Sequence, residues 1–219
     1  MIVADRNESA AAEAVATIGV AARAAILDVS SESSVQNAFA QLNASGWAPN
    51  VVIANAGVQL FGQDAAVAEL EIETWRRTID VNLTGTFLTV KHAVRSMLKH
   101  GGGAIILTGS PTGLTGEGAR FTAYSTSKAG IHGLARTVAA AYADRNIRVN
   151  TVVPGYTETG LVTAISSDPE ARAAIVGRIP LGRAGAPSDV EGIMVFLASS
   201  DGEFATGSLF AVDGGMTSL

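Results

Sequence analysis

Short apolar runs alternate with longer amphipathic stretches along this chain. The apolar runs predict strands at residues 1–4, 24–27, 51–54, 104–108, 147–153 and 208–213. The stretches between them repeat apolar residues at helical spacing and predict helices at residues 33–44, 72–99, 122–144 and 188–199. Ser33 and Gln36 have the spacing of a capping box at the start of the first helix. Strands that alternate with helices are typical of a parallel sheet covered by helices, so the pattern predicts an α/β fold.

Composition narrows the class of protein. The 219 residues suffice for one well-packed domain, and no linker-like segment divides them, so residues 1–219 are predicted to form a single domain. The net charge of −5 argues against a nucleic-acid partner, which would require a basic face. No apolar stretch reaches membrane-spanning length, and no metal-ligand constellation is present in the sequence. The absence of cysteine fits a reducing compartment, and we predict a cytoplasmic protein.

The segment AYSTSKAG contains a candidate acid–base pair. Tyr124 and Lys128 lie four positions apart on a predicted helix, so both side chains leave the same helix face. An ammonium group near a phenol favours the phenolate and lowers the pKa of the tyrosine. Tyr124 would then be a usable general acid or base near neutral pH. A surface tyrosine beside a surface lysine has the same spacing, so the pair alone does not identify a site.

Other candidate residues follow predicted strands, where open α/β sheets place their ligands. Gly109 and Ser110 end one strand, and the Ser110 hydroxyl could hydrogen-bond a substrate oxygen. The NAG segment at 55–57 ends another strand, and its small residues would let a flat ligand approach closely. Asn82 interrupts a long apolar helix and needs polar partners if it is buried. Each of these features alone is also compatible with a tight turn or a structural amide.

Together the motifs resemble the short-chain dehydrogenase/reductase family. NAG after a strand, an Asn within the following helix, a Ser after the next strand, Y-x-x-x-K, PG-x-x-x-T and a terminal VDGG occur here in the family's order. The resemblance extends over essentially all 219 residues. It implies a Rossmann-type, doubly wound parallel sheet. It also implies an enzyme that interconverts a small-molecule secondary alcohol and a ketone by hydride transfer to or from a nicotinamide cofactor.

The resemblance implies roles for individual residues. Tyr124 would be the catalytic acid or base, Lys128 would lower its pKa and contact the nicotinamide ribose, and Ser110 would orient the substrate oxygen. Asn82 would hold the water of a proton relay to Lys128. The implied cofactor-binding residues are Asp5, Asp28, Val29, Asn55, Ala56, Gly57, Tyr124, Lys128, Pro154, Gly155, Thr157 and Thr159. The spacing from Ser110 to Tyr124 is one residue longer than is usual in the family, with the extra residue within GEGARFTAY.

Cofactor choice depends on Asp5, which follows the first apolar run. An acid at the end of this strand accepts hydrogen bonds from the adenosine ribose hydroxyls and repels a 2′-phosphate, so we expect NAD in preference to NADP. Arg6 argues in the other direction, because a base at that position could bind the phosphate.

The family's first strand, its T-G-x-x-x-G-x-G loop and its first helix have no counterpart in this sequence, so we expect a truncated form of a longer protein. That strand would lie between the strands at 1–4 and 51–54, whose backbone groups would otherwise lack partners. Direct pairing of those two strands and a borrowed strand are the alternatives. The same observation keeps a second function open, namely a non-catalytic remnant that acts only through oligomer contacts.

Two further expectations concern substrate and partners. Residues 157–186 are predicted to form a variable substrate lid, and the identity of the substrate is not readable from the sequence. The long helices at 72–99 and 122–144 are expected to form the interface of a homodimer or homotetramer, as they do in the family.

Overall fold

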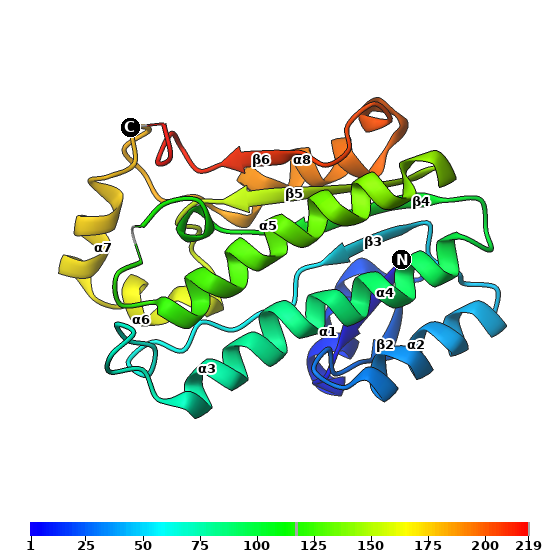
Figure 1. The fold of residues 1–219 in the computed structure, drawn as a ribbon, viewed down its shortest axis with the longest axis horizontal. Helices are drawn as coiled ribbons and strands as arrows, with labels where there is room; N and C mark the ends of the chain where they lie inside the picture. Colours follow the sequence, from blue (N-terminus) through cyan, green and yellow to red (C-terminus); the bar gives the residue numbers. More distant parts are fainter. Residues whose placement is uncertain (117, 219) are drawn as a thin grey trace.

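The structure is a computed structural model that describes residues 1–116 and 118–218 (Figure 1). Its strands are β1 (Ile2–Asp5), β2 (Arg23–Ile26), β3 (Val51–Ala54), β4 (Gly103–Thr108), β5 (Ile147–Pro154) and β6 (Leu209–Val212). Its α-helices are α1 (Glu8–Ile18), α2 (Glu32–Ala44), α3 (Ile72–Ile79), α4 (Gly85–Met97), α5 (Thr122–Tyr142), α6 (Thr163–Ser166), α7 (Pro169–Val176) and α8 (Pro187–Ala198). All six predicted strands are confirmed, with ends about one residue from those predicted.

The strands form two parallel sheets. β3, β4, β5 and β6 pair in that order, and β1 and β2 form a separate pair. All pairings are parallel, which confirms the predicted α/β class. In the part of the chain that the structure describes, β1 and β3 do not pair with each other to close the gap between the sheets. One edge of each strand therefore has no neighbouring strand, and the Ile53 side chain on β3 is 48% exposed.

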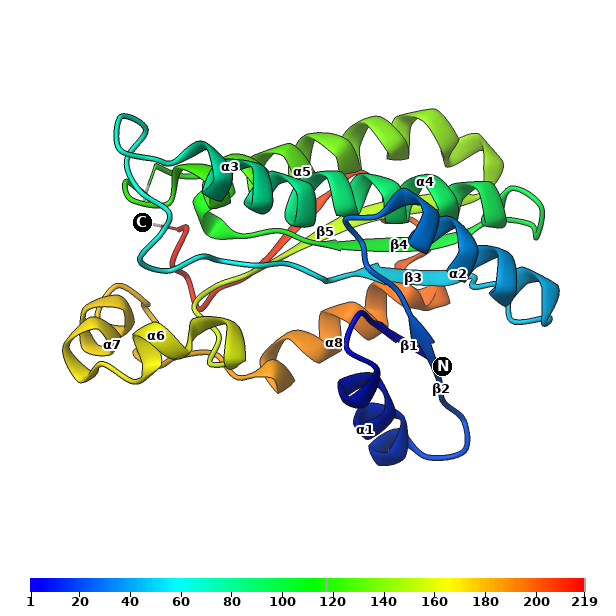
Figure 2. The same cartoon turned by 90° about the horizontal axis from the view of Figure 1, so that it is seen from below.

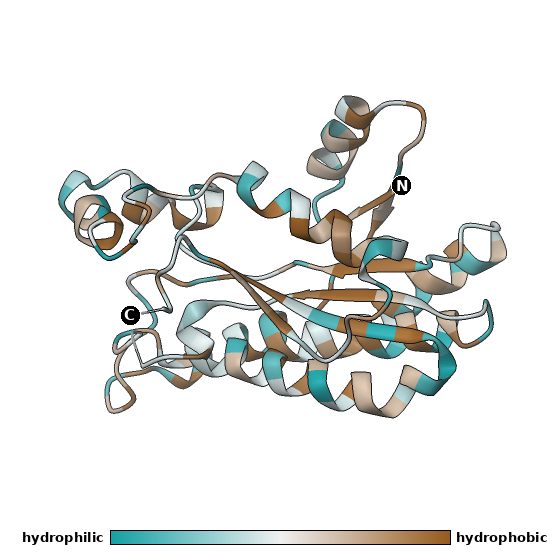
Figure 3. Ribbon diagram, turned by 90° about the horizontal axis from the view of Figure 1, so that it is seen from above, coloured by the Kyte–Doolittle hydropathy of each residue, from teal (hydrophilic) through white to brown (hydrophobic). Residues whose placement is uncertain are grey.

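Helices cover both faces of the four-stranded sheet. Figure 2 shows α3, α4 and α5 along one face and α8 along the other. β4 alternates its side chains between the two layers, because Ile105 and Leu107 belong to the core cluster with α4 and α5 while Ile106 packs with Leu197 of α8. Much of the sheet is brown in Figure 3, although polar residues interrupt β5. α2 packs against α4 and so joins the β1–β2 pair to the rest of the fold.

The long helix predicted at 72–99 is interrupted. α3 and α4 are joined by a π-helical turn, Asp80–Thr84. Asn82 lies in this turn with its side chain fully buried, and its carbonyl accepts a 2.6 Å hydrogen bond from Thr86 Oγ1. A π turn is a common way for a helix to aim a functional side chain. The periodicity of the apolar residues does not reveal the extra residue in the turn, which is why the sequence predicts a continuous helix.

The helix predicted at 33–44 begins one residue earlier, at Glu32, and its predicted N-cap is wrong by two residues. Ser31, not Ser33, is the N-cap, and its Oγ accepts the Ser34 N–H at 3.3 Å. Ser33 lies inside the first turn, with its hydroxyl 3.1 Å from that of Ser31. Three serines in four positions offer several equivalent caps, so spacing alone cannot choose among them.

The predicted lid at 157–186 contains the short helices α6 and α7, which lie beyond the carboxyl ends of β5 and β6 in Figure 1. Within residues 1–116 and 118–218, no helix combines the length and apolar character that a bilayer crossing requires. Glu117, which falls in the segment with the predicted extra residue, lies outside the described residues.

Candidate active site

A cleft of about 1130 Å³ opens at the carboxyl ends of the strands, between the β1–β2 pair, the four-stranded sheet and the lid. The predicted site residues that line it are Asp5, Asp28, Val29, Asn55, Ala56, Gly57, Ser110, Tyr124, Lys128, Pro154, Gly155, Thr157 and Thr159. Asn82 is absent from the lining, because it is buried beside the wall formed by Gly57. The structure therefore brings residues from six separate segments to one cavity, as open α/β sheets do.

Tyr124 and Lys128 leave the same face of α5, as their spacing predicts. The Lys128 Nζ lies 5.6 Å from the centre of the Tyr124 ring and donates a 2.8 Å hydrogen bond to the Thr108 carbonyl at the end of β4. Both side chains are buried, at 7% and 5% exposure. Burial disfavours the ammonium form and lowers the pKa of Lys128 to about 8.

The predicted lowering of the Tyr124 pKa is wrong for this structure. Burial is the largest influence and raises the pKa of Tyr124 above its ordinary value, and a hydrogen bond with the Ser110 side chain opposes it. The nearby Lys128 charge does not bring the pKa of Tyr124 below its ordinary value. The reason is that the phenol is removed from water almost completely, a property that the spacing of two residues in a sequence does not reveal.

Ser110 lies where β4 ends and a 3₁₀ turn, Pro111–Gly113, begins. Its Oγ is 3.1 Å from the Thr112 Oγ1 and accepts the Thr112 N–H at 3.4 Å, so the hydroxyl is oriented within its own turn. A Cβ on Gly113 would lie 2.8 Å from the Ala129 nitrogen, so the turn packs directly on α5. Only glycine allows that approach, and it brings Ser110 and Tyr124 to the same part of the cleft.

Asn82 links two other parts of the site. Its Oδ1 accepts the Val58 N–H at 2.7 Å, and its Nδ2 donates to the Val58 carbonyl at 2.8 Å and to Ser127 Oγ at 3.1 Å. The amide thus pairs with the chain that follows β3 as a neighbouring strand would. Among the described residues, the hydrogen bonds of the Asn82 side chain are to these groups and none is to Lys128, so its role in a water relay stays a prediction.

The end of the cleft at β1 contains two acids, Asp5 and Asp28, and one base, Arg6. The Asp5 Oδ1 accepts the Asn7 N–H at 2.8 Å, and the residue is exposed. Asp28 Oδ1 accepts 2.9 Å and 2.6 Å bonds from the backbone and hydroxyl of Ser30, which hold the pKa of Asp28 below its ordinary value. Each carboxylate thus has one oxygen bonded within its own turn, and Asp5 is the more exposed of the two acids.

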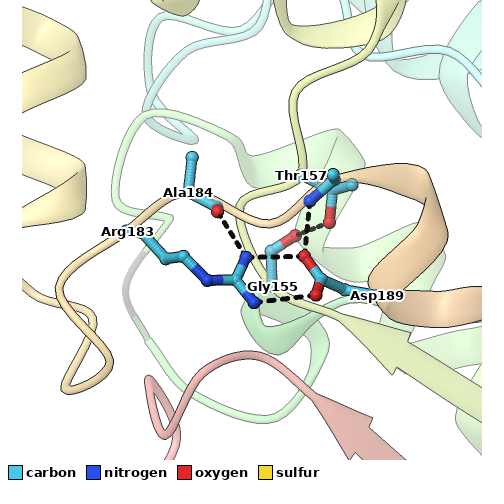
Figure 4. Close-up of polar contacts among 6 residues, drawn as sticks. Gly155, Thr157, Arg183, Ala184 and Asp189 are labelled. Carbon is cyan, nitrogen blue, oxygen red and sulfur yellow. Dashed lines mark hydrogen bonds and ion pairs between the residues drawn. The ribbon is translucent and has the colours of Figure 1, made fainter.

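The base of the lid is fixed by an ion pair that is shown in Figure 4. Arg183 Nη1 and Nη2 each lie 2.7 Å from an oxygen of Asp189 on α8, and Asp189 Oδ2 also accepts the Ala186 N–H at 2.8 Å. This holds Gly185 beside Thr157 in a parallel bridge. The segment 156–158 is therefore held against Gly185, whose N–H donates to the Tyr156 carbonyl and whose carbonyl accepts the Glu158 N–H, both at 2.9 Å.

Asp64 is a buried residue near the site that the sequence analysis did not identify. It lies between β3 and α3, is 7% exposed, and its carboxylate accepts backbone N–H groups at the start of α5. The sequence GQDAAV matches no motif. A buried acid in a loop can be recognised only once its partners, about sixty positions away, are known.

The residues that line the cleft fit a dinucleotide. The cavity is large enough for one, since ligand sites commonly span about 300–1,000 Å³. Asp5 supplies a carboxylate for ribose hydroxyls at one end, and Lys128 supplies a cation at the other. Thr157 and Thr159, which follow β5, bring hydroxyl groups to the wall of the cleft. The 219-residue sequence holds no T-G-x-x-x-G-x-G loop of the kind that binds the phosphates of a dinucleotide.

Comparison with known proteins extends over nearly the whole chain. A family model described as enoyl-(acyl carrier protein) reductase matches residues 1–217. The chain is 40% identical over 192 residues to cis-4-hydroxycyclohexanecarboxylate dehydrogenase of Sinomonas cyclohexanicum, an alignment that covers 88% of this chain and 75% of the relative. It is 39% identical over 219 residues to inactive 2-(S)-hydroxypropyl-CoM dehydrogenase 2 of Xanthobacter autotrophicus, covering 98% of this chain and 94% of that protein.

Solved structures share the fold. A gluconate 5-dehydrogenase from Burkholderia cenocepacia, determined in complex with NADP and tartrate, superimposes with a TM-score of 0.94 at 31% sequence identity. The superposition covers 100% of this chain and 85% of that one. The arrangement of strands and helices in Figures 1 and 2 is therefore that of a known class of enzymes.

Proposed function

The chain belongs to the short-chain dehydrogenase/reductase family of NAD(P)-dependent oxidoreductases, and from this premise we propose that it interconverts a secondary alcohol and a ketone with Tyr124 as acid and base. The observation that supports the proposal is the joint placement of Ser110, Tyr124 and Lys128 along one cleft that also holds Asp5. Bound NAD(P) would supply the hydride acceptor or donor.

The chain's own residues move the proton. In the reductive direction Tyr124 Oη gives its proton to the carbonyl oxygen, and in the oxidative direction it takes the alcohol proton. Because burial raises the pKa of Tyr124, the phenol is protonated at neutral pH and ready to act as the acid. The Ser110 hydroxyl orients the substrate oxygen, and the Lys128 ammonium stabilises the phenolate that forms.

Cofactor binding is the first test. We expect the 219-residue chain to bind NADH saturably, seen as a rise in nicotinamide fluorescence, and to reduce members of a panel of ketones at the nicotinamide absorbance. Aliphatic and alicyclic ketones suit the lid, since Leu161, Val162, Ile165 and Ile175 line the cleft. A chain that binds NADH but turns over no ketone would contradict the proposed reaction and leave the cofactor assignment intact.

A second function has a specific observation in its favour. The open edges of β1 and β3 and the missing glycine-rich phosphate loop would fit a non-catalytic protein that acts through oligomer contacts. The relative from Xanthobacter autotrophicus that aligns with 98% of this chain is itself named as inactive. Absence of saturable NADH binding by a folded chain would favour this second function over the first.

We propose NAD as the preferred cofactor because Asp5 lines the cleft at the end of β1, where an acid would meet the adenosine ribose in a dinucleotide fold. Replacing Asp5 with serine is expected to raise the ratio of kcat/KM with NADP to kcat/KM with NAD by ~10-fold, since one repulsive charge is removed while Arg6 stays. Steady-state kinetics with both cofactors measure the ratio. Glu8→Gln, which removes an exposed acid outside the cleft, is the control, and an equal change in both variants would refute the role of Asp5.

Two further expectations complete the proposal. We propose a homo-oligomer whose interface uses the outer surfaces of α3, α4 and α5, where the Phe87 side chain is 45% exposed. Light scattering of the purified chain measures the mass of the assembly. The predicted cytoplasmic location stays a prediction.

A further inference from the structure

The helix that bears Tyr124 begins without a cap of its own. The N-cap residue of α5 is Phe121, whose side chain cannot accept a hydrogen bond. The first bond within the helix runs from the Ser125 N–H to the Phe121 carbonyl at 2.9 Å. The N–H groups of Thr122, Ala123 and Tyr124 precede that bond and need acceptors from elsewhere in the fold.

Asp64 supplies two of these acceptors. Its Oδ1 accepts the Ala123 N–H at 3.1 Å, and its Oδ2 accepts the Tyr124 N–H at 2.9 Å. The same Oδ1 also accepts the Ala65 N–H at 2.9 Å. Both carboxylate oxygens are therefore engaged, and the backbone of the proposed acid–base residue is itself bonded to a side chain from another part of the chain.

The loop that contains Asp64 is attached to α5 at further points. The Ala65 carbonyl accepts the Thr122 hydroxyl at 2.7 Å and the Thr122 N–H at 3.4 Å. The Phe61 ring meets the Phe121 ring edge to face, with centres 5.6 Å apart. At its other end the loop is held by the two bonds between Val58 and Asn82. The segment 58–65 is thus fixed at both ends, and its residues Val58 and Gln59 line the cleft.

This arrangement does more than cap a helix. A serine or aspartate at position 121 would satisfy the same N–H groups locally, without burying a carboxylate. Burying a charge is unfavourable unless it is fully hydrogen-bonded, which three N–H donors achieve here. What the distant cap adds is a rigid connection between the loop that borders the cleft and the backbone of Tyr124.

We propose that Asp64 is a positioning residue for Tyr124, which holds the first turn of α5 against the loop at 58–65 so that the phenol faces the cleft beside Ser110. The inference deepens the proposed function and rests on it for its kinetic consequence. Its structural part, the engagement of the Ala123 and Tyr124 amides, is independent of turnover.

Hydrogen exchange and kinetics of two variants test the proposal. In Asp64→Ala the amides of Ala123 and Tyr124 are expected to exchange at least about fivefold faster, while those at 135–142 keep their rates. A misplaced phenol lowers kcat by ~10- to 100-fold. NADH affinity is expected to stay within about twofold of the original. Asp64→Asn keeps one acceptor oxygen and is expected to recover part of the loss, which separates positioning from failure to fold.

The matched control is Ser31→Ala, which removes the cap of α2 at a site outside the cleft. Its kcat is expected to stay within about twofold of the original. Equal kcat values for Asp64→Ala and Ser31→Ala, or unchanged exchange at Ala123 and Tyr124, would overturn the proposal. If the original chain turns over no ketone, the proposed function fails, and the exchange rates alone decide on Asp64: faster exchange supports it and unchanged exchange refutes it.

Discussion

Replacing Tyr124 with phenylalanine is expected to lower kcat for ketone reduction by ~10²–10⁴-fold while NADH affinity stays within about twofold. The substitution removes the only atom of the side chain that can exchange a proton with the substrate oxygen and leaves the ring in place. Apart from Lys128, no other described residue of α5 lines the cleft, so α5 offers no other group that could take over the transfer.

Stopped-flow measurement of NADH oxidation and fluorescence titration of NADH provide the two readouts. Tyr142→Phe is the matched control, because Tyr142 ends the same helix and lies outside the cleft. Alcohol oxidation by the original chain should become faster as pH rises, because Tyr124 must lose its proton to act as a base and burial raises its pKa. A Tyr124→Phe variant that keeps more than about a tenth of the activity would remove Tyr124 from the mechanism.

Strand positions and the polar residues that follow them could be read from the sequence, because buried parallel strands are short apolar runs and their carboxyl ends meet at one edge. Tyr124, Lys128 and Ser110 were predicted to share a site, and all three line the cleft. Their proximity follows from local spacing and from the register of one strand with the helix after it.

Features that depend on distant partners could not be predicted. Asp64 and Val58 owe their roles to bonds with α5 and with Asn82, about sixty and about twenty-four positions away. The direction of the Tyr124 pKa depends on how completely its hydroxyl is removed from water. Neither bonds of this separation nor degrees of burial leave a periodic pattern or a short motif in the chain, so neither can be recognised from the sequence.

Replacing Lys128 with methionine is expected to stabilise the protein at neutral pH and to remove most of its activity. The pKa of Lys128 is about 8, against an ordinary value of 10.5, so the folded state binds this proton less tightly than the unfolded state does. This difference in pKa means that the buried ammonium lowers the free energy of unfolding at neutral pH by ~3 kcal/mol. The variant also loses the hydrogen bond to the Thr108 carbonyl, which offsets ~1 kcal/mol of the gain from removing the charge. The expected net gain in the free energy of unfolding is ~2 kcal/mol.

The pH dependence of the free energy of unfolding distinguishes the removal of a buried charge in Lys128→Met from an improvement in packing. Below about pH 8 both states of the original chain hold the proton, and the folded state bears the full cost of a buried ammonium. Between about 8 and 10.5 the unfolded state keeps the proton that the folded state has lost, so the free energy of unfolding rises with pH. The advantage of Lys128→Met should therefore shrink across this range and be lost above it.

Urea denaturation at pH 7, 8, 9 and 10 measures the effect, and Lys99→Met, which removes an exposed ammonium, should change stability by less than ~0.5 kcal/mol. Activity should fall by ~10²-fold or more, because the phenolate of Tyr124 loses the one described cation near its ring. A variant less stable than the original at pH 7, or an advantage that does not vary with pH, would contradict the buried charge as the cause. Gain of stability together with loss of activity is the expected signature of a residue kept for function at a cost to the fold.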